Sequence, residues 1–178
     1  MAGTEYKDRM AGMENITGVS LVPLTTSRYL SPLRMEFRQA SRVRAWDLMR
    51  CHDSVAIVIF NTTEQRFVLV RQFRPAVYIS VAGRRLGCEL GPGSKVDTVT
   101  VPPSLGFTLE LCAGIVDKPE LSLAEVAREE VEEECGYRVP ADRLTKIIRD
   151  CAFTSISLLP IFISTAAAGP YFEFDINE

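Results

Sequence analysis

The stretch that decides the fold is Ala113-Gly-Ile-Val-Asp-Lys-Pro-Glu-Leu-Ser-Leu-Ala-Glu-Val-Ala-Arg-Glu-Glu-Val-Glu-Glu-Glu-Cys-Gly-Tyr137. Ser122 with Glu125 three residues later is typical of a capping box, the reciprocal side-chain pairing that begins a helix. Gly136 stands where a helix C-terminus favours glycine. We therefore expect a helix over Ser122–Cys135, preceded by a glycine-containing loop.

The second half of this helix is crowded with acids, because five glutamates fall within Glu129–Glu134. Residues at i, i+3 and i+4 share one helix face, so Glu130, Glu133 and Glu134 are expected to project together. Such carboxylates repel each other unless cations lie between them, and hard oxygen ligands suit Mg²⁺. A charge run alone more often marks a solvated face. The strand, glycine loop, capped helix and terminal glycine around it favour a metal site.

The stretch resembles the Nudix box, G-x5-E-x7-R-E-U-x-E-E-x-G-U, where U is a bulky apolar residue. Gly114 matches the opening glycine, and the closing half matches in spacing from Glu130 to Tyr137. The loop is one residue longer than the pattern, so the first glutamate is not cleanly placed at Glu120. The arginine position holds Glu129, with Arg128 one residue early. In the motif the arginine contacts the metal-binding glutamate and holds it in place, and the replacement by Glu129 puts that contact in question.

Three flanking blocks look like the UDP-sugar pyrophosphatase branch of the Nudix family: Trp46–Val55, Val68–Tyr78 and Leu109–Gly114. The resemblance covers roughly Arg28 to Tyr137. It implies an α/β fold, a Nudix α/β/α sandwich around a mixed sheet, with a small N-terminal β element. It also implies hydrolysis of a nucleoside diphosphate sugar, with UDP-glucose giving UMP and glucose 1-phosphate, and a homodimer whose N-terminal strands reach across to the partner.

The resemblance also assigns roles to individual residues. The carboxylates of the helix would bind Mg²⁺ together with one backbone carbonyl, and the ions would activate a water for attack on phosphorus. An arginine would hold a phosphate or ribose oxygen, a second would reach the diphosphate, and a tryptophan would stack on the base. The metal set is Glu130, Glu133, Glu134 and Ala113, and the substrate set is Arg74, Arg44 and Trp46 in that order.

Other interpretations of the same residues stay open. From the sequence alone Trp46 is at least as consistent with plain packing, and His52 is expected to be structural. The nearest enzymatic alternative is an ADP-ribose or ADP-sugar pyrophosphatase. A non-catalytic nucleotide-binding or dimerising partner is the alternative from another class, favoured by Glu129 and by the short C-terminal part.

The predicted organisation has three parts: a disordered N-terminus over 1–15, a dimerising β element over 16–50, and the hydrolase domain over 51–178. The last is expected to be C-terminally incomplete, because no closing helix follows the box. Within these parts we expect a strand pair, a long surface loop, a further strand, a helical turn, a strand-like segment and an apolar run. Their ranges are Ser54–Phe60 with Phe67–Gln72, residues 79–105, Thr108–Cys112, Ala141–Leu144, Ile147–Arg149 and Ile156–Ile163.

Composition limits the remaining possibilities. The 178 residues carry a net charge of -3, which argues against a nucleic-acid partner. The five cysteines form no CxxC pair, which favours buried thiols in the reducing cytoplasm over a zinc site. Met1–Asn15 lacks the apolar core of a signal peptide. The run Ile156–Ala168 is broken by Pro160 and is shorter than the ~20 residues of a membrane span, so no membrane partner is expected.

Overall fold

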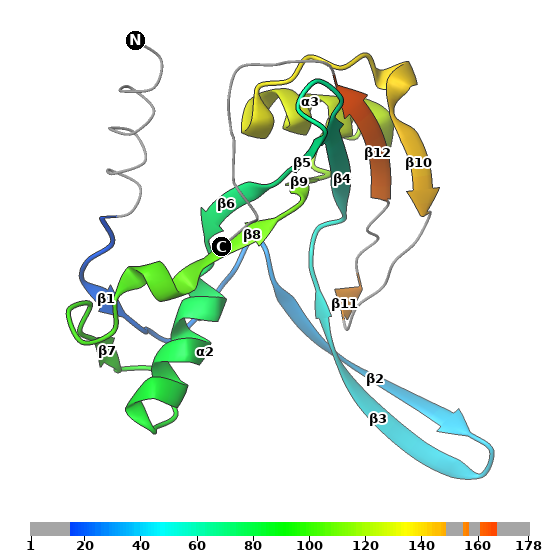
Figure 1. Cartoon of the computed structure of the whole chain (residues 1–178). Coiled ribbons are helices and arrows are strands. Elements are labelled where there is room, and N and C mark those ends of the chain that lie inside the picture. Colours follow the sequence, from blue (N-terminus) through cyan, green and yellow to red (C-terminus); the bar gives the residue numbers. More distant parts are fainter. Residues whose placement is uncertain (1–14, 149–154, 157–160, 167–178) are drawn as a thin grey trace. The chain divides into compact units, whose positions relative to one another are not determined.

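The computed structural model describes residues 15–148, 155–156 and 161–166, and the chain divides into two compact units (Figure 1). The larger unit comprises Thr26–Val70 and Leu111–Glu178, and the smaller comprises Met1–Thr25 and Arg71–Glu110. Each unit has a hydrophobic core of its own.

The larger unit is built on strand β4 (Ser54–Asn61), whose side chains are almost continuously buried. Such a run is typical of a strand covered on both faces. Its neighbours run in both directions: β12 is parallel to it, while β5 and β9 are antiparallel, and β10 extends the sheet beyond β12. The predicted mixed sheet is therefore confirmed. Bounds are β5 Arg66–Val68, β9 Cys112–Ile115, β10 Thr145–Ile148 and β12 Ile161–Ala166.

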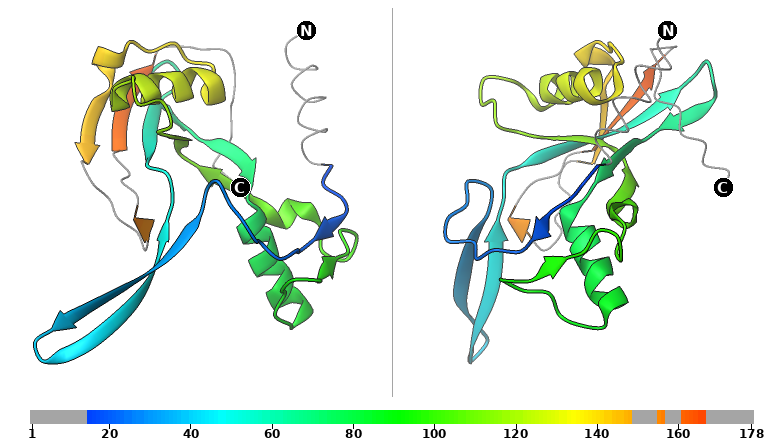
Figure 2. Two further views of the ribbon diagram at one scale, coloured as in Figure 1. Left: turned by 180° about the vertical axis from the view of Figure 1, so that it is seen from behind. Right: turned by 90° about the vertical axis from the view of Figure 1, so that its left-hand side faces the viewer.

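Helix α3 (Leu123–Cys135) packs on this sheet, as both views in Figures 1 and 2 show. Its start is the predicted capping box: Ser122 Oγ accepts from the Glu125 amide at 3.3 Å, and Glu125 Oε2 accepts from the Ser122 amide at 2.8 Å. Gly136, at φ 71°, ends it in the left-handed conformation that glycine favours. The helix buries a stripe against β4, β9 and β12, consisting of Val126, Ala127, Val131 and Cys135. The predicted turn near Ala141–Leu144 is the 3-10 helix η2 (Ala141–Arg143).

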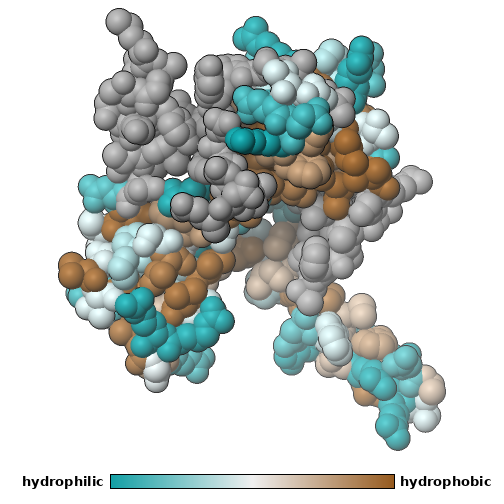
Figure 3. Space-filling view, in the orientation of Figure 1, coloured by the Kyte–Doolittle hydropathy of each residue, from teal (hydrophilic) through white to brown (hydrophobic). Residues whose placement is uncertain are grey.

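Strands β2 (Ser31–Gln39) and β3 (Arg42–Arg50) form an antiparallel hairpin, the predicted N-terminal β element. Directly paired residues share a face. One face carries apolar pairs such as Met35 opposite Trp46, and the other carries the ion pair of Arg34 Nε with Asp47 Oδ1 at 2.7 Å. On the side of this hairpin that faces the viewer in Figure 3, hydrophobic and hydrophilic residues lie next to each other. Strand β11 (Ser155–Ile156) pairs with the end of β3 in parallel.

The smaller unit corrects one prediction. Much of the loop expected over 79–105 is ordered: α2 spans Pro75–Leu86, β7 (Lys95–Val96) pairs with β1 (Val19–Ser20), and η1 spans Pro103–Gly106. The expectation was wrong because it weighed glycine and proline content alone. Pro75 lies in the first turn, where proline is tolerated, and Gly87 lies at the C-cap with φ 65°.

The unit's core fixes this helix. Tyr78 and Ala82 are buried against Val96 and Val101, and the Tyr78 hydroxyl donates to the Val101 carbonyl at 2.6 Å. Strand β6 (Val70–Phe73) pairs with β8 (Phe107–Glu110) beside it. The strand predicted over Thr108–Cys112 is thus two strands, β8 and β9, and the second run of the predicted pair is likewise divided into β5 and β6.

Some predictions fall wholly or partly outside the described residues. These are the disordered N-terminus 1–15, the end of the run Ile147–Arg149, the middle (157–160) of the run Ile156–Ile163, the C-terminal incompleteness and the burial of Cys151. Of the other cysteines, Cys112 and Cys135 are buried as expected, Cys51 is half-buried, and Cys88 is exposed, contrary to the expectation. Within the described ranges no helix is both long and apolar enough to cross a membrane.

The capping box predicts how much the start of α3 contributes to stability. Ser122→Ala removes the acceptor for the Glu125 amide and should lower the free energy of unfolding by about 1 kcal/mol. Urea denaturation followed by circular dichroism measures this. Ser80→Ala, at an exposed position within α2, is the control and should change stability by less than about 0.5 kcal/mol. Equal losses in both variants would contradict the role of the cap.

Candidate active site

The site is organised by a close approach between β9 and α3. A Cβ built on Gly114 would lie 1.8 Å from Glu130 Cδ and 1.9 Å from its Oε1. The Glu130 carboxylate therefore occupies the space above Gly114 that any other residue would fill. Gly114 pairs with Val55 of the buried strand β4, so this part of the site is fixed to the centre of the sheet.

The neighbouring carboxylate is fixed to the same strand. Glu134 Oε2 accepts a hydrogen bond from the Ala113 backbone amide at 3.1 Å. Burial, and then the charges of Glu134 and Glu133, together raise the pKa of Glu130 to about 7. These electrostatic effects require the three carboxylates to lie close together, as the i, i+3, i+4 spacing predicts.

The donor set has the chemistry that Mg²⁺ prefers. Carboxylate oxygens from Glu130, Glu133 and Glu134 and backbone oxygens of β9 are hard ligands. Burial and then the charges of Glu134 and Glu133 raise the pKa of Glu130, and a divalent cation would offset the charge of these carboxylates. In the structure, no group of three or more His, Cys, Asp or Glu side chains among the described residues is already gathered as a metal cluster. The residues offer the oxygen ligands that Mg²⁺ prefers, and their roles as ligands remain a prediction.

Glu129, at the arginine position of the motif, has a cationic partner that the sequence analysis did not identify. Lys118 Nζ donates to Glu129 Oε2 at 2.6 Å, and Arg128 Nη2 donates to Glu129 Oε1 at 3.3 Å. Lys118 lies in the loop between β9 and α3. The opposite charges of Lys118 and Glu129 are visible in the sequence. The two residues are eleven positions apart and Lys118 lies outside the helix, so the i+3 and i+4 spacings of helical neighbours do not predict the contact.

Arg74 lies in the smaller unit, immediately before α2, where Glu110 holds it. Its Nε donates to Glu110 Oε1 at 2.8 Å and to Oε2 at 3.0 Å, and its Nη2 also contacts Oε2. Thr108 Oγ1 donates to Glu110 Oε1 at 2.6 Å. The Arg74 guanidinium, helped by Thr108, lowers the pKa of Glu110, against the opposing effect of burial. Glu110 is a second residue that the sequence analysis missed.

Arg44 and Trp46 lie on β3, on the same face of the hairpin, opposite Phe37 and Met35 respectively. Trp46 is 64% exposed, so the packing alternative does not hold within the described part of one chain. His52 contacts the Arg28 carbonyl through Nε2 at 3.3 Å, in keeping with the structural role expected of it. The structure thus places Glu130 against Gly114 and Glu134 against the Ala113 amide, whereas the metal-binding roles of these residues and the substrate-binding roles of Arg44, Trp46 and Arg74 stay predictions.

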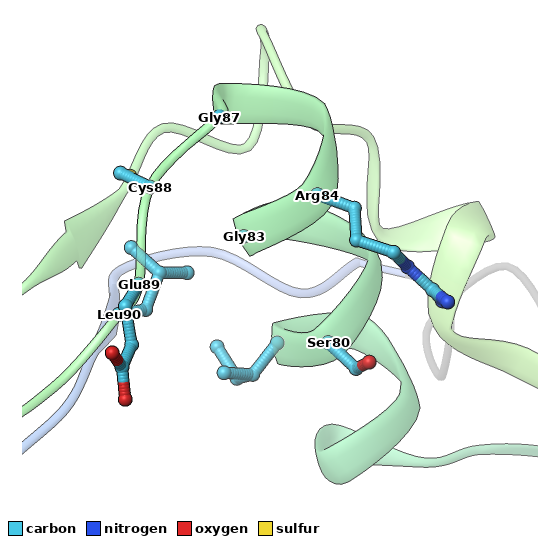
Figure 4. Close-up of a pocket in the computed structure, with 8 residues that line it drawn as sticks. Ser80, Gly83, Arg84, Gly87, Cys88, Glu89 and Leu90 are labelled. Atoms are coloured by element: carbon cyan, nitrogen blue, oxygen red, sulfur yellow. The ribbon is translucent and has the colours of Figure 1, made fainter.

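A separate hollow of about 530 Å³ runs along the C-terminal half of α2 in the smaller unit (Figure 4). Its lining includes Arg84, Cys88, Glu89 and Leu90. In Figure 4 Arg84 points away from Glu89 and Leu90, so the charged groups do not converge on one ligand position. None of the predicted site residues lines this hollow.

Comparison with known proteins supports the class indicated by this site. The chain matches no protein-family model. It is 43% identical over 144 residues to uridine diphosphate glucose pyrophosphatase NUDT14 of Bos taurus, which covers 76% of this chain and 63% of the relative. It is 44% identical over 135 residues to the Mus musculus protein of the same name, covering 73% and 61%. The chain therefore spans somewhat less than two thirds of these relatives.

Among solved structures, the chain is similar to an ADP compounds hydrolase, with a TM-score of 0.50 and 18% identity over 91% of this chain and 73% of that one. At this identity the likeness concerns the fold alone, and it confirms the predicted α/β fold around a mixed sheet. The resemblance of the chain to Nudix hydrolases is likewise confirmed by the two named relatives at 43% and 44% identity. Within that class, the chain is a relative of the uridine diphosphate glucose pyrophosphatases over the aligned residues.

The space above Gly114 generates a specific prediction. Gly114→Ala should displace the Glu130 carboxylate and weaken Mg²⁺ binding by about tenfold or more. It should change stability by less than about 1 kcal/mol, because the atoms that must move, from Glu130 Cγ outward, belong to a flexible side chain and not to the backbone. Isothermal titration calorimetry and urea denaturation measure the two effects. Gly91→Ala, where a Cβ meets nothing within 4 Å, should leave both unchanged.

The raised pKa of Glu130 predicts a pH-dependent stability. The folded protein holds its proton up to about pH 7, whereas the unfolded chain releases it near the ordinary value. Stability without metal should therefore fall as pH rises between these values. At pH 8 in EDTA, Glu130→Gln should have a free energy of unfolding on the order of 1–2 kcal/mol higher than that of wild type, after allowance for the partial exposure of the side chain. At pH 5 the difference should shrink by more than half.

Glu132→Gln is the matched control for this experiment, because Glu132 lies on the same helix but accepts from Arg138 Nε at 2.8 Å. It should show no comparable gain at pH 8. A Glu130→Gln variant whose stability relative to wild type is independent of pH would contradict the electrostatic account of the site.

Proposed function

We propose that this protein hydrolyses the diphosphate of a nucleoside diphosphate sugar with the help of Mg²⁺, and that UDP-glucose is converted to UMP and glucose 1-phosphate. The observation that carries the proposal is the Glu130 carboxylate held above Gly114, with Glu133 and Glu134 beside it. The printed name of the relatives, uridine diphosphate glucose pyrophosphatase, supports the choice of substrate.

In the proposed mechanism Glu130, Glu133, Glu134 and the Ala113 carbonyl hold the metal. Bound there, Mg²⁺ supplies positive charge against the diphosphate and acidity to an attacking water. Glu134 keeps its orientation through the Ala113 amide. Burial and the neighbouring carboxylates raise the pKa of Glu130, and a bound cation would lower it, so metal binding would favour deprotonation of Glu130.

The substrate's remaining groups are assigned to three residues. Arg74, oriented by Glu110, binds a phosphate or ribose oxygen, a task to which a fixed guanidinium fork is suited. Trp46 stacks on the base and Arg44 reaches the diphosphate. Both lie on the exposed face of the hairpin, where a ligand can approach them.

We further propose a homodimer and a cytoplasmic location. The hairpin has an apolar face that includes Met35 and Trp46, 46% and 64% exposed, and an isolated two-stranded hairpin is only marginally stable in water. A second copy packing on the Met35 part of this face would reduce its exposure and would leave Trp46 accessible to the base. The four described cysteines are free thiols, which supports a reducing compartment.

The test is product release from UDP-glucose, ADP-glucose and ADP-ribose by the purified chain, with Mg²⁺ and with EDTA. We expect Mg²⁺-dependent release of UMP, fastest with UDP-glucose. Fastest turnover of an ADP compound would move the assignment to the ADP-ribose or ADP-sugar alternative. Binding of UDP-glucose by folded protein without any turnover would favour the non-catalytic alternative.

A pair of glutamate variants tests the residues. Glu134→Gln should lower kcat by roughly 100-fold or more, because it removes a proposed metal ligand. Glu132→Gln, two residues earlier and bonded to Arg138, should retain activity. Steady-state kinetics with UDP-glucose measures both, and circular dichroism checks that each variant is folded. Similar losses in the two variants would refute the assignment of Glu134.

A further inference from the structure

The loop between β9 and α3 is tied to the helix by one short ion pair. Lys118 Nζ and Glu129 Oε2 are 2.6 Å apart, and the two side chains are 48% and 28% exposed. The pair joins a loop residue four positions after Gly114 to a helix residue immediately before Glu130. It therefore spans the same two elements that bring Gly114 and Glu130 together.

The electrostatic surroundings of this pair are strongly acidic. The charge of Lys118 acts on Glu129 first and also on Glu133 and Asp117, and it acts on Glu130 in the sense opposite to the neighbouring carboxylates. Arg128 also contacts Glu129, but at 3.3 Å and from the adjacent helix position. Lys118 thus brings a positive charge to the carboxylate-bearing face from outside the helix.

The charges of the pair are reversed relative to the Nudix motif. The motif has a cation on the helix at the position of Glu129, whereas here the helix has the anion and the loop has the cation. An ion pair between a helix and a loop can hold the two elements together with either partner carrying either charge. In this chain the Lys118–Glu129 pair therefore connects the loop to the helix although the motif's arginine is replaced.

We propose that Lys118 is a positioning residue: by binding Glu129 it fixes the loop to α3 and so holds Glu130 in the orientation needed to bind the metal. The inference rests on the proposed Mg²⁺-dependent function. Lys118 acts through Glu129 and does not need to contact the substrate. As a half-exposed pair it should contribute little to overall stability, so its effect should be visible in metal binding and turnover.

The direction of the change in Mg²⁺ affinity separates positioning from simple charge. Lys118→Met removes a positive charge beside the site, and electrostatics alone would make Mg²⁺ bind more tightly. Positioning predicts the opposite, a roughly tenfold loss of Mg²⁺ affinity and of kcat, the usual effect of losing a residue that orients a ligand. The KM for UDP-glucose and the melting temperature should change little.

The decisive variant is the double exchange Lys118→Glu with Glu129→Lys, which keeps the net charge and reverses the pair. It should restore Mg²⁺ affinity and kcat to within about threefold of wild type, whereas either single change should not. Arg128→Met is the matched control, because it removes the other cation beside Glu129 and should not weaken Mg²⁺ binding. Calorimetry with MgCl₂ and steady-state kinetics with UDP-glucose provide the measurements.

The outcomes distinguish this inference from the proposed function. Tighter or unchanged Mg²⁺ binding in Lys118→Met, or failure of the double exchange to recover in a folded variant, overturns the positioning role and leaves the proposed function standing. An equal loss in Arg128→Met also overturns it. A wild-type protein that is folded but neither binds Mg²⁺ nor hydrolyses UDP-glucose overturns both.

Discussion

The structure of the candidate site depends on one steric constraint, the contact of the Glu130 carboxylate with the backbone at Gly114. It requires a residue without a side chain in β9 and a helix that begins at the right distance from it. The capping box at Ser122 fixes that start, and the left-handed Gly136 fixes the end. Pairing of Gly114 with Val55 anchors the contact in the buried strand β4. The acidic face is thus placed by backbone geometry before any cation is involved.

The part of this arrangement that could be predicted from the sequence is the part encoded locally. The capped helix follows from Ser122, Glu125 and Gly136, and the shared face of the glutamates follows from helical spacing. The position of Glu130 above Gly114 could not be predicted in the same way, because it depends on the path of the loop 116–122 between β9 and α3. The Lys118–Glu129 contact was missed for the same reason.

The smaller unit shows the converse failure. Glycines and prolines over 79–105 suggested a loop, yet α2 forms there because Pro75 and Gly87 lie at its ends, where they are favoured, and Tyr78 and Ala82 find a core. That core includes Val96, which pairs with Val19, a residue much earlier in the chain. Composition within a window cannot report such a distant contact, so tertiary packing overrides the local signal.

The pairing of β12 with β4 has a consequence for how the chain acquires its structure. Ile161 lies beside Ala56, and the parallel register continues along all six residues of β12, so a closure of roughly a hundred residues must precede this contact. During synthesis the buried strand β4 emerges long before its parallel neighbour. Until then the helix and the antiparallel strands β5 and β9 are its available partners within the described part of the larger unit. Folding of this unit is therefore expected to be slow, with its final cooperative step waiting for the last strand of the sheet.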